Sequence, residues 1–367
     1  MIKFLDLNSI NNTFYNIFKK KLDENFHDSK FILSKYTEKF ENNFKKFISS
    51  KYCACVGNGT DALEIAIEAL NLKKGSEVIV PANTFVATAE AVIRNNFKVK
   101  FCDIDNKNLG FDIKKLEKKI TSKTSAIIVV HLYGIPEKMN NILKLCKKYN
   151  LRLVEDCSQA HGSKIMGKFV GNFGDISTFS FFPGKILGGI GDGGACVTNN
   201  KKLYDKIKKI RNHGRLKKFD HEIVGRNSRL DSLNSIFLDL KLKDLKKEIK
   251  IRSEMSTLYY QKLKNNKNIF LPNLSNDVSI SFCYFPIFLK KNRKSLISYL
   301  KKNKIQTQMH YPSIVPELKA FREKNYKVNY KNSFKLSQMT LSLPIGSHLS
   351  LKNINFISDK INNFYDS

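Results

Sequence analysis

Hydrophobic positions along the first 175 residues alternate between helical and strand spacing. Residues 60–70, TDALEIAIEAL, carry apolar side chains at helical intervals with Thr60 as the expected N-cap, and EVIVPA follows as a short strand. The alternation continues through helices expected near residues 87–96, 112–120 and 137–150 and strands near residues 99–104, 125–134 and 152–158. Strands that alternate with helices predict parallel pairing in an α/β sheet with helices on both faces.

The pattern changes after residue 175. Strands expected at residues 175–182 and 194–199 flank a glycine-rich loop, and a charged helix at 201–212 precedes a long amphipathic helix over about 230–263. The remaining chain predicts a smaller α/β unit with strands near residues 279–289 and 340–345, a helix near 291–302 and a final helix. We therefore expect a large domain over residues 1–240 and a smaller C-terminal domain over residues 241–367.

Composition adds a strong positive charge to this picture. Lys and Arg number 64 against 33 Asp and Glu, which gives a net charge of +31. A basic chain of this kind can bind nucleic acid. Here the lysines are spread along helix surfaces, and no basic motif with interleaved aromatic residues is present. This spread of lysines indicates a generally lysine-rich protein whose positive charge attracts a phosphorylated small substrate. It predicts no nucleic-acid partner.

Membrane and metal partners find no support in the sequence. The longest apolar run, near residues 126–130, is far shorter than the roughly 20 residues that span a bilayer, and the first residues lack the apolar region of an export signal. The seven cysteines include no CxxC pair, which argues against a disulfide framework and a zinc site. We expect a cytoplasmic protein without a metal.

The first candidate site is the segment VGNGTDALEIAI at residues 56–67. Glycines and Thr60 at the first turn of a helix leave backbone N–H groups unpaired, and the positive end of the helix dipole points the same way. Such a turn can bind a phosphate group. An ordinary glycine turn before a helix is the alternative.

The second candidate site is VEDCSQAHG at residues 154–162, where a strand ends in polar residues. Glu155 and Asp156 point to opposite faces of a strand, so only one of them can enter a site at its end. That carboxylate could bind a metal, act as a base, pair with a cationic cofactor nitrogen, or merely cap a helix. No other His or carboxylate stands at a recognisable metal-ligand spacing.

The third candidate is FSFFPGKILGGIGDGG at residues 179–194, which contains Lys185. A lysine that acts as a nucleophile must lose its proton, and apolar surroundings, here the neighbouring phenylalanines, lower a lysine pKa from about 10.4. The glycines let the backbone approach a bulky ligand. Alone, Lys185 could be a solvated loop lysine. Together, a phosphate cradle, a carboxylate and an imine-forming lysine are the parts of a pyridoxal phosphate enzyme.

The motifs also occur in the order and spacing of a known family. They are GNGTDAL, VPANTFVATAEA, VEDCSQAHG, GDISTFSFFPGK, GDGGACVTNN, RNHG, GRNSRLDSLNS, HYP and LSLP. Over nearly its whole length the chain resembles the DegT/DnrJ/StrS sugar aminotransferases, which are pyridoxal 5'-phosphate enzymes of the aspartate aminotransferase fold (fold type I).

This resemblance implies a role for each matching residue. Lys185 would hold the cofactor aldehyde as an imine and then carry the proton that moves during amino transfer. The other implied cofactor contacts are Asp156 at the ring nitrogen, Gln159 near the ring hydroxyl, Phe85 against the ring face, and Gly59, Thr60 and Ser180 at the phosphate, with Asp61 in the same cradle. Asn227 would reach the phosphate from the neighbouring subunit of a homodimer, and His310 and Tyr311 would lie near the sugar.

The resemblance also implies the reaction. A branch of the family that dehydrates sugars has histidine in place of the lysine, so Lys185 indicates amino transfer. The implied substrates are glutamate and a nucleotide-linked keto sugar, chiefly the 3-keto group of a dTDP-linked 6-deoxyhexose, for an amino sugar of surface glycans such as lipopolysaccharide. The alternatives are a UDP-linked 3-keto or 4-keto sugar, and a non-catalytic protein of this fold that binds a sugar nucleotide.

Three departures from the family pattern stand out. Ile186 follows the lysine where the family often has asparagine, and HYPSIVPELKAF lacks a His and a Gln common after the HYP. We expect both to affect sugar contacts and neither to affect the chemistry at Lys185. In the long helix, SLNSI replaces the usual ELQAA, which we interpret as a neutral change on a helix face.

Overall fold

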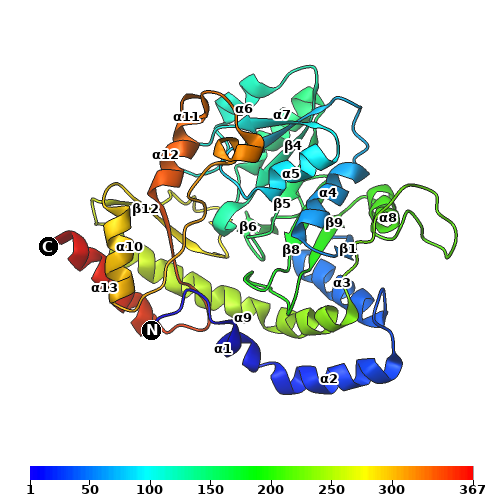
Figure 1. The fold of residues 1–367 in the computed structure, drawn as a ribbon, viewed down its shortest axis with the longest axis horizontal. Helices are drawn as coiled ribbons and strands as arrows, with labels where there is room; N and C mark the ends of the chain where they lie inside the picture. Colours follow the sequence, from blue (N-terminus) through cyan, green and yellow to red (C-terminus); the bar gives the residue numbers. More distant parts are fainter. Residues whose placement is uncertain (367) are drawn as a thin grey trace.

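A seven-stranded sheet forms the centre of the molecule in Figure 1, a computed structural model that describes residues 1–366. Its strand order is β1-β9-β8-β5-β4-β2-β3. The strands are β1 (Tyr52–Val56), β2 (Glu77–Pro81), β3 (Lys98–Cys102), β4 (Thr124–Val130), β5 (Arg152–Asp156), β8 (Ile176–Ser180) and β9 (Gly194–Thr198). Strands β3, β2, β4, β5 and β8 pair in parallel, whereas β9 is antiparallel to β8 and β1. The predicted α/β fold with a mostly parallel, mixed sheet is confirmed.

Helices cover both faces of this sheet, as Figure 1 shows. One face packs against α3 (Lys35–Ile48), α6 (Ile113–Lys119), α7 (Met139–Tyr149) and α9 (Ser232–Leu263). The other face packs against α4 (Gly59–Ala69), α5 (Ala87–Arg94) and α8 (Lys201–Ile210). Because each face is buried, the strands are nearly continuous runs of buried residues, as parallel strands usually are.

A smaller sheet follows the long helix α9. Its order is β10-β12-β13, and all its pairs are antiparallel. The elements of this part are β10 (Ile269–Phe270), β12 (Phe285–Leu289), α10 (Arg293–Lys302), α11 (Tyr326–Asn329), α12 (Lys331–Met339), β13 (Thr340–Leu343) and α13 (Leu351–Asp366). The expected boundary between residues 240 and 241 falls inside α9, and the division into two domains stays a prediction.

The rest of the described chain consists of short elements and the N-terminal helices. A third sheet joins β11 (Val278–Ser279), β6 (Lys164–Ile165) and β7 (Lys168–Phe169). The helices are α1 (Leu7–Asn12) and α2 (Tyr15–Asp28), and the 3₁₀ turns are η1 (Leu132–Gly134), η2 (Val315–Glu317) and η3 (Lys319–Phe321). Within residues 1–366, no helix combines the length and the apolar character that a bilayer crossing needs.

Two local predictions differ from the structure. Strand β1 was not expected, because CACV has only one β-branched residue and its partner, β9, lies about 140 residues further along the chain. The N-cap of α4 is Asn58, not Thr60: the Asn58 side chain accepts a hydrogen bond from the N–H of Asp61 at 2.8 Å. Asn and Thr are both good N-caps, so the sequence did not distinguish them.

Candidate functional site

Three of the predicted segments meet at one edge of the central sheet. Asp156 is the last residue of β5, Ser180 is the last residue of β8, and Gly59 is the first residue of α4. The start of α4 touches the end of β8 so closely that a Cβ atom on Gly59 would lie 2.7 Å from the Cβ of Ser180. This is the carboxyl edge of the parallel strands, where ligands of such sheets bind.

The start of α4 offers free hydrogen-bond donors. Within residues 1–366, no acceptor bonds to the backbone N–H of Gly59 or Thr60, while the Asn58 cap satisfies that of Asp61. The Asp61 carboxylate accepts a hydrogen bond from Ser228 and so faces the protein. Two free N–H groups at the positive end of a helix suit an anion. The phosphate role of this segment stays a prediction.

Asp156 is a buried carboxylate without a cationic partner. Its side chain is 5% exposed, and it accepts hydrogen bonds from the Thr88 hydroxyl at 3.3 Å and the Ser158 N–H at 3.1 Å. No Lys, Arg or His among the described residues forms an ion pair with it. Because a buried unpaired charge is unfavourable, this position suits a ligand that brings a positive nitrogen.

Glu155 points to the opposite face of β5, as predicted. It is fully buried and accepts hydrogen bonds from the N–H groups of Gly171, Phe173 and Gly174, from the Ser177 hydroxyl and from the His131 ring. Burial alone raises the pKa of Glu155, but the hydrogen bonds from His131 and the backbone outweigh it and leave the pKa below its ordinary value. Glu155 therefore fixes the loop before β8, while Asp156 faces the site.

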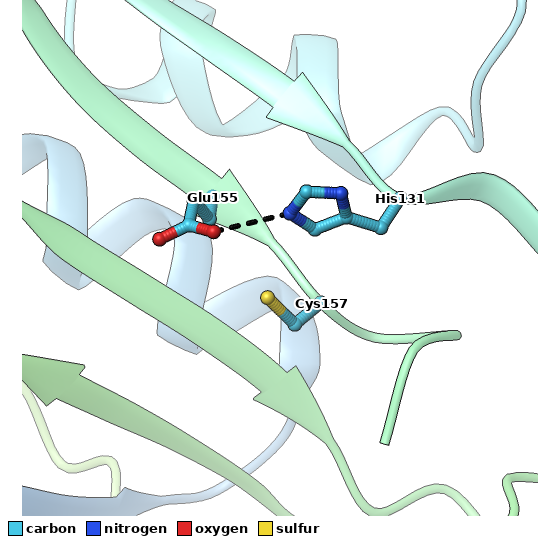
Figure 2. Close-up of side chains that lie close together, drawn as sticks. All are labelled: His131, Glu155 and Cys157. Atoms are coloured by element: carbon cyan, nitrogen blue, oxygen red, sulfur yellow. Dashed lines mark hydrogen bonds and ion pairs between the residues drawn. The ribbon is translucent and has the colours of Figure 1, made fainter. Parts of the chain in front are cut away.

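Figure 2 shows Glu155 with His131 and Cys157, a grouping with the composition of a metal site. The ring Nδ1 of His131 accepts a hydrogen bond from the N–H of Glu137 at 3.1 Å, so Nε2 carries the proton that it donates to Glu155 at 3.1 Å. Both ring nitrogens are thus occupied, and burial raises the pKa of the Cys157 thiol far above its usual range. His131 and Glu155 thus belong to a hydrogen-bond network within the protein core, and the buried Cys157 thiol lies beside it.

Lys185 lies in the loop between β8 and β9 and is partly exposed. Among residues 1–366, its ammonium group has no hydrogen-bond or ion-pair partner. The residue borders a cavity of about 280 Å³, which also contacts the N-terminal segment and α9. Phe179 and Phe181 pack on Phe44 in the core, and Phe182 is 54% exposed. Phe179 and Phe181 therefore belong to the core, whereas Phe182 lies at the surface.

The charge of Lys185 affects two nearby histidines. Burial, and then the Lys185 ammonium, lower the pKa of His161 to about 3 and that of His310 to about 4. Both rings are therefore neutral at pH 7. His310 stacks on Tyr284 with 3.9 Å between ring centroids, and its Nδ1 lies 2.9 Å from the Ser342 hydroxyl.

The remaining predicted contacts lie around Tyr311. The Gln159 amide accepts a hydrogen bond from the N–H of Tyr133 at 2.7 Å and donates one to the Tyr311 hydroxyl at 3.1 Å. The Phe85 ring lies 5.6 Å from that of Tyr311, and Phe85 is 51% exposed and therefore accessible to a ligand. Asn227 is exposed, and its role stays a prediction.

Sequence reasoning missed the contacts of α9 with the Lys185 loop. Asn234 accepts a hydrogen bond from the N–H of Ile190 and donates one to the carbonyl of Asp192, and Lys241 donates one to the carbonyl of Gly188. The segment SLNSI therefore lies against this loop, and the interpretation of its departure as a neutral change stays a prediction. Ile186 is 5% exposed and packs in the core beneath the loop. The only sequence signal was the spacing of seven between two polar residues of α9.

Comparison with known proteins gives a family match. The model of the DegT/DnrJ/EryC1/StrS aminotransferase family matches residues 15–362. A dTDP-3-amino-3,6-dideoxy-alpha-D-galactopyranose transaminase of Aneurinibacillus thermoaerophilus is 37% identical over 368 residues, covering 99% of each chain.

Solved structures agree with this match. The structure of DesV from S. venezuelae in complex with a ketimine intermediate superimposes with a TM-score of 0.97 at 31% sequence identity, covering 100% of this chain and 99% of that chain. The structure of ntda from Bacillus subtilis with bound cofactor PMP gives a TM-score of 0.88 at 28% identity, covering 98% of this chain and 85% of that chain.

Proposed function

The chain belongs to the DegT/DnrJ/EryC1/StrS aminotransferase family, and we propose that it uses pyridoxal 5'-phosphate to transfer the amino group of glutamate to a nucleotide-linked keto sugar. The preferred sugar is the 3-keto form of a dTDP-linked 6-deoxyhexose. The similarity to the A. thermoaerophilus transaminase over 99% of both chains supports this choice. The enzyme would act in the cytoplasm and supply amino sugars for surface glycans such as lipopolysaccharide.

One observation carries the proposal: Lys185 and Asp156, at one edge of the sheet, both lack an ion-pair partner among the described residues. The charge of Lys185 lowers the pKa of His310, and the charge of Asp156 adds to the effect of burial in raising the pKa of the adjacent Tyr311. The two charges thus act on two consecutive residues, Lys185 on His310 and Asp156 on Tyr311. A ligand with a cationic ring nitrogen and an aldehyde satisfies both groups at once.

The residues present fit this cofactor. Asp156 would hold the ring nitrogen, Gln159 would lie near the ring hydroxyl, and the accessible Phe85 would stack on the ring. The phosphate would bind the free N–H groups of Gly59 and Thr60 beside Ser180. When bound, pyridoxal 5'-phosphate supplies an electron sink for the negative charge left when a proton leaves the carbon bonded to nitrogen.

The side chains of this chain would perform the proton transfers. Nζ of Lys185, once neutral, can accept the proton from the substrate carbon bonded to nitrogen and deliver it to the carbon on the other side of that nitrogen, as a general base and then a general acid. Asp156, which accepts hydrogen bonds from a hydroxyl and an N–H, would pair with the ring nitrogen and keep that nitrogen protonated. His310 is neutral at pH 7, so it can exchange hydrogen bonds with a sugar hydroxyl without adding a charge.

We also propose a homodimer with shared active sites. The loop around residues 213–226 carries exposed apolar side chains, of which Phe219 is 80% and Val224 is 91% exposed. Apolar exposure on this scale is typical of a surface that another protein covers. Asn227 follows this loop directly and is itself exposed, so a second copy seated on the loop would bring Asn227 to its partner's phosphate site.

The test uses the two half-reactions separately. Purified protein should be yellow, with absorption near roughly 410–430 nm that borohydride removes by fixing the cofactor to Lys185. Glutamate alone should then convert the cofactor to its amine form in a single turnover, which removes this absorption band. A panel of dTDP- and UDP-linked 3-keto and 4-keto sugars should restore it, fastest with the dTDP-linked 3-keto sugar. Failure to take up the cofactor would overturn the proposal.

A second outcome would select a different function. Uptake of cofactor without any conversion by glutamate would favour a non-catalytic protein that binds sugar nucleotides. Faster turnover of a UDP-linked 3-keto or 4-keto sugar would change the substrate and leave the amino-transfer reaction unchanged.

A further inference from the structure

The loop of Lys185 packs on the core through Ile186 and Leu187, which are 5% and 0% exposed, and it borders a cavity on the side of α9. Within the loop, the N–H of Lys185 bonds to the carbonyl of Phe182 at 2.9 Å, and the N–H of Gly189 bonds to the carbonyl of Phe181 at 2.8 Å. The cavity of about 280 Å³ lies between this loop and α9. On the side of this cavity, hydrogen bonds from α9 add to the core packing of Ile186 and Leu187 in holding the loop.

Helix α9 provides those hydrogen bonds from two residues on one face. Asn234 and Lys241 are seven residues apart, which is two helical turns, so they face the loop together. Asn234 accepts from the N–H of Ile190 at 3.0 Å and donates to the carbonyl of Asp192 at 2.9 Å. Lys241 donates to the carbonyl of Gly188 at 2.8 Å. Gly188 is three residues from Lys185.

Lys241 is an unusual residue for such a contact. It is 7% exposed, and no carboxylate forms an ion pair with it in the described part of the chain. Its other contacts are the Asn11 side-chain oxygen at 3.4 Å and the Phe237 ring, whose centroid lies 5.6 Å away. Burial lowers the pKa of Lys241 to about 8. An apolar residue of the same length would avoid this desolvation, so packing does not explain the lysine.

We propose that Lys241 is a positioning residue for the reaction at Lys185: its hydrogen bond to the Gly188 carbonyl holds the loop across the cavity and sets the place of the Lys185 amine. This inference rests on the proposed aminotransferase function. Without the bond, the Gly188 carbonyl loses its partner on α9, and the loop backbone beside the cavity becomes less firmly held. The amine then spends less time where it can accept the substrate proton, and a small displacement of a reacting group lowers the rate strongly.

The test compares Lys241→Met with Lys247→Met in the full chain with cofactor. Lys247 lies on the same helix and borders the same cavity, but it is exposed and forms no hydrogen bond with the loop. The two variants therefore lose the same charge near the same cavity. Hydrogen–deuterium exchange of residues 185–190 is measured together with the single-turnover rate with glutamate, which does not require knowledge of the sugar.

In Lys241→Met we expect these amides to exchange at least about tenfold faster. Glutamate should convert the cofactor at least about tenfold more slowly, while the concentration of glutamate that gives half the maximal rate changes little. Lys247→Met should match the wild type in both. Unchanged exchange in Lys241→Met, or an equal effect in Lys247→Met, would overturn the proposal. The exchange measurement stays informative if the wild type proves inactive with every amino donor, so the two proposals fail separately.

A second variant covers the case in which Lys241→Met does not fold. Lys241→Arg keeps a charged donor, and the adjacent cavity offers space for the larger group. It should retain wild-type loop exchange and a conversion rate within about threefold. A folded Lys241→Arg protein with normal loop exchange and a tenfold lower rate would contradict a positioning role.

Discussion

Glu155 and Asp156 are consecutive residues of β5, and their carboxylates serve opposite faces of the central sheet. Glu155 bonds to the loop before β8 and to His131, whereas Asp156 bonds to Thr88 of α5 and faces the candidate site. Two adjacent, buried carboxylates therefore have separate roles, and substituting each residue alone should cause a different defect.

The first prediction uses this pair. Asp156→Asn should lower the conversion rate by about 100-fold or more, because a neutral amide cannot keep a ring nitrogen protonated, while the protein remains folded and retains cofactor. Glu155→Gln should instead lower the free energy of unfolding by about 3 kcal/mol, because an amide replaces a carboxylate that accepts five hydrogen bonds. Stopped-flow absorption and urea denaturation measure the two effects. The same defect in both variants would contradict the assignment.

The second prediction concerns Glu137 and pH. Burial raises the pKa of Glu137 to about 7 from 4.5, so the folded protein binds more protons than the unfolded chain between these values. The contribution of Glu137 to stability should therefore fall as pH rises from 4.5 to 7, by roughly 3 kcal/mol for a shift of this size. Glu137→Gln removes the titration and can still accept the hydrogen bond of the Phe111 N–H.

Urea denaturation of both proteins at several pH values gives the difference in their unfolding free energies. This difference should move in favour of Glu137→Gln as the pH rises through the window. A difference that does not vary with pH would show that the buried carboxyl does not titrate there.

The third prediction compares two glycines of the Lys185 loop. A Cβ atom on Gly188 would lie 2.2 Å from the carbonyl oxygen of Pro183, whereas one on Gly191 would meet no atom within 4 Å. Gly188→Ala should therefore displace the loop and reduce the cofactor bound per subunit severalfold. Gly191→Ala should stay within about 0.5 kcal/mol of the wild-type stability. Cofactor absorption and thermal unfolding test both, and full cofactor occupancy in Gly188→Ala would refute the close contact.

The fourth prediction tests the shared site. Lys185→Ala and Asn227→Asp should each be inactive, the second because a carboxylate repels the phosphate. If Asn227 serves the partner's site, subunits exchanged between the two variants form dimers in which one site has both native residues. Random mixing should then restore about one quarter of the wild-type activity. No recovery after verified subunit exchange would place Asn227 in the site of its own chain.

The sequence was sufficient for most of the large sheet because most of its strands are short apolar runs between helices with regular apolar spacing. Each of the strands β2, β4, β5, β8 and β9 overlaps a predicted strand. Local patterns also predicted that Gly59, Asp156 and Ser180 lie at one edge of the sheet, because the carboxyl ends of parallel strands meet there. The prediction failed for β1, whose stability depends on a distant partner strand.

Contacts between distant segments were not predictable in the same way. Nothing in the local pattern around Asn234 or Lys241 indicates that these residues face a loop about 45 residues earlier in the chain. The stacking of His310 on Tyr284 and the five donors around Glu155 depend equally on tertiary packing. Spacing identifies the face of a helix that is buried, but not the segment that covers it.

Helix α9 reaches both the loop of Lys185 and the segment that leads into the smaller sheet. Lys241 holds Gly188, and three turns later Arg252 donates to the carbonyls of Phe282 and Cys283 at 2.9 and 3.1 Å. At about 1.5 Å per residue, these two anchors are separated by roughly 16 Å of one stiff rod. One rigid helix therefore fixes the distance between the Lys185 loop and the segment that enters the smaller sheet, so the positions of these two parts depend on each other.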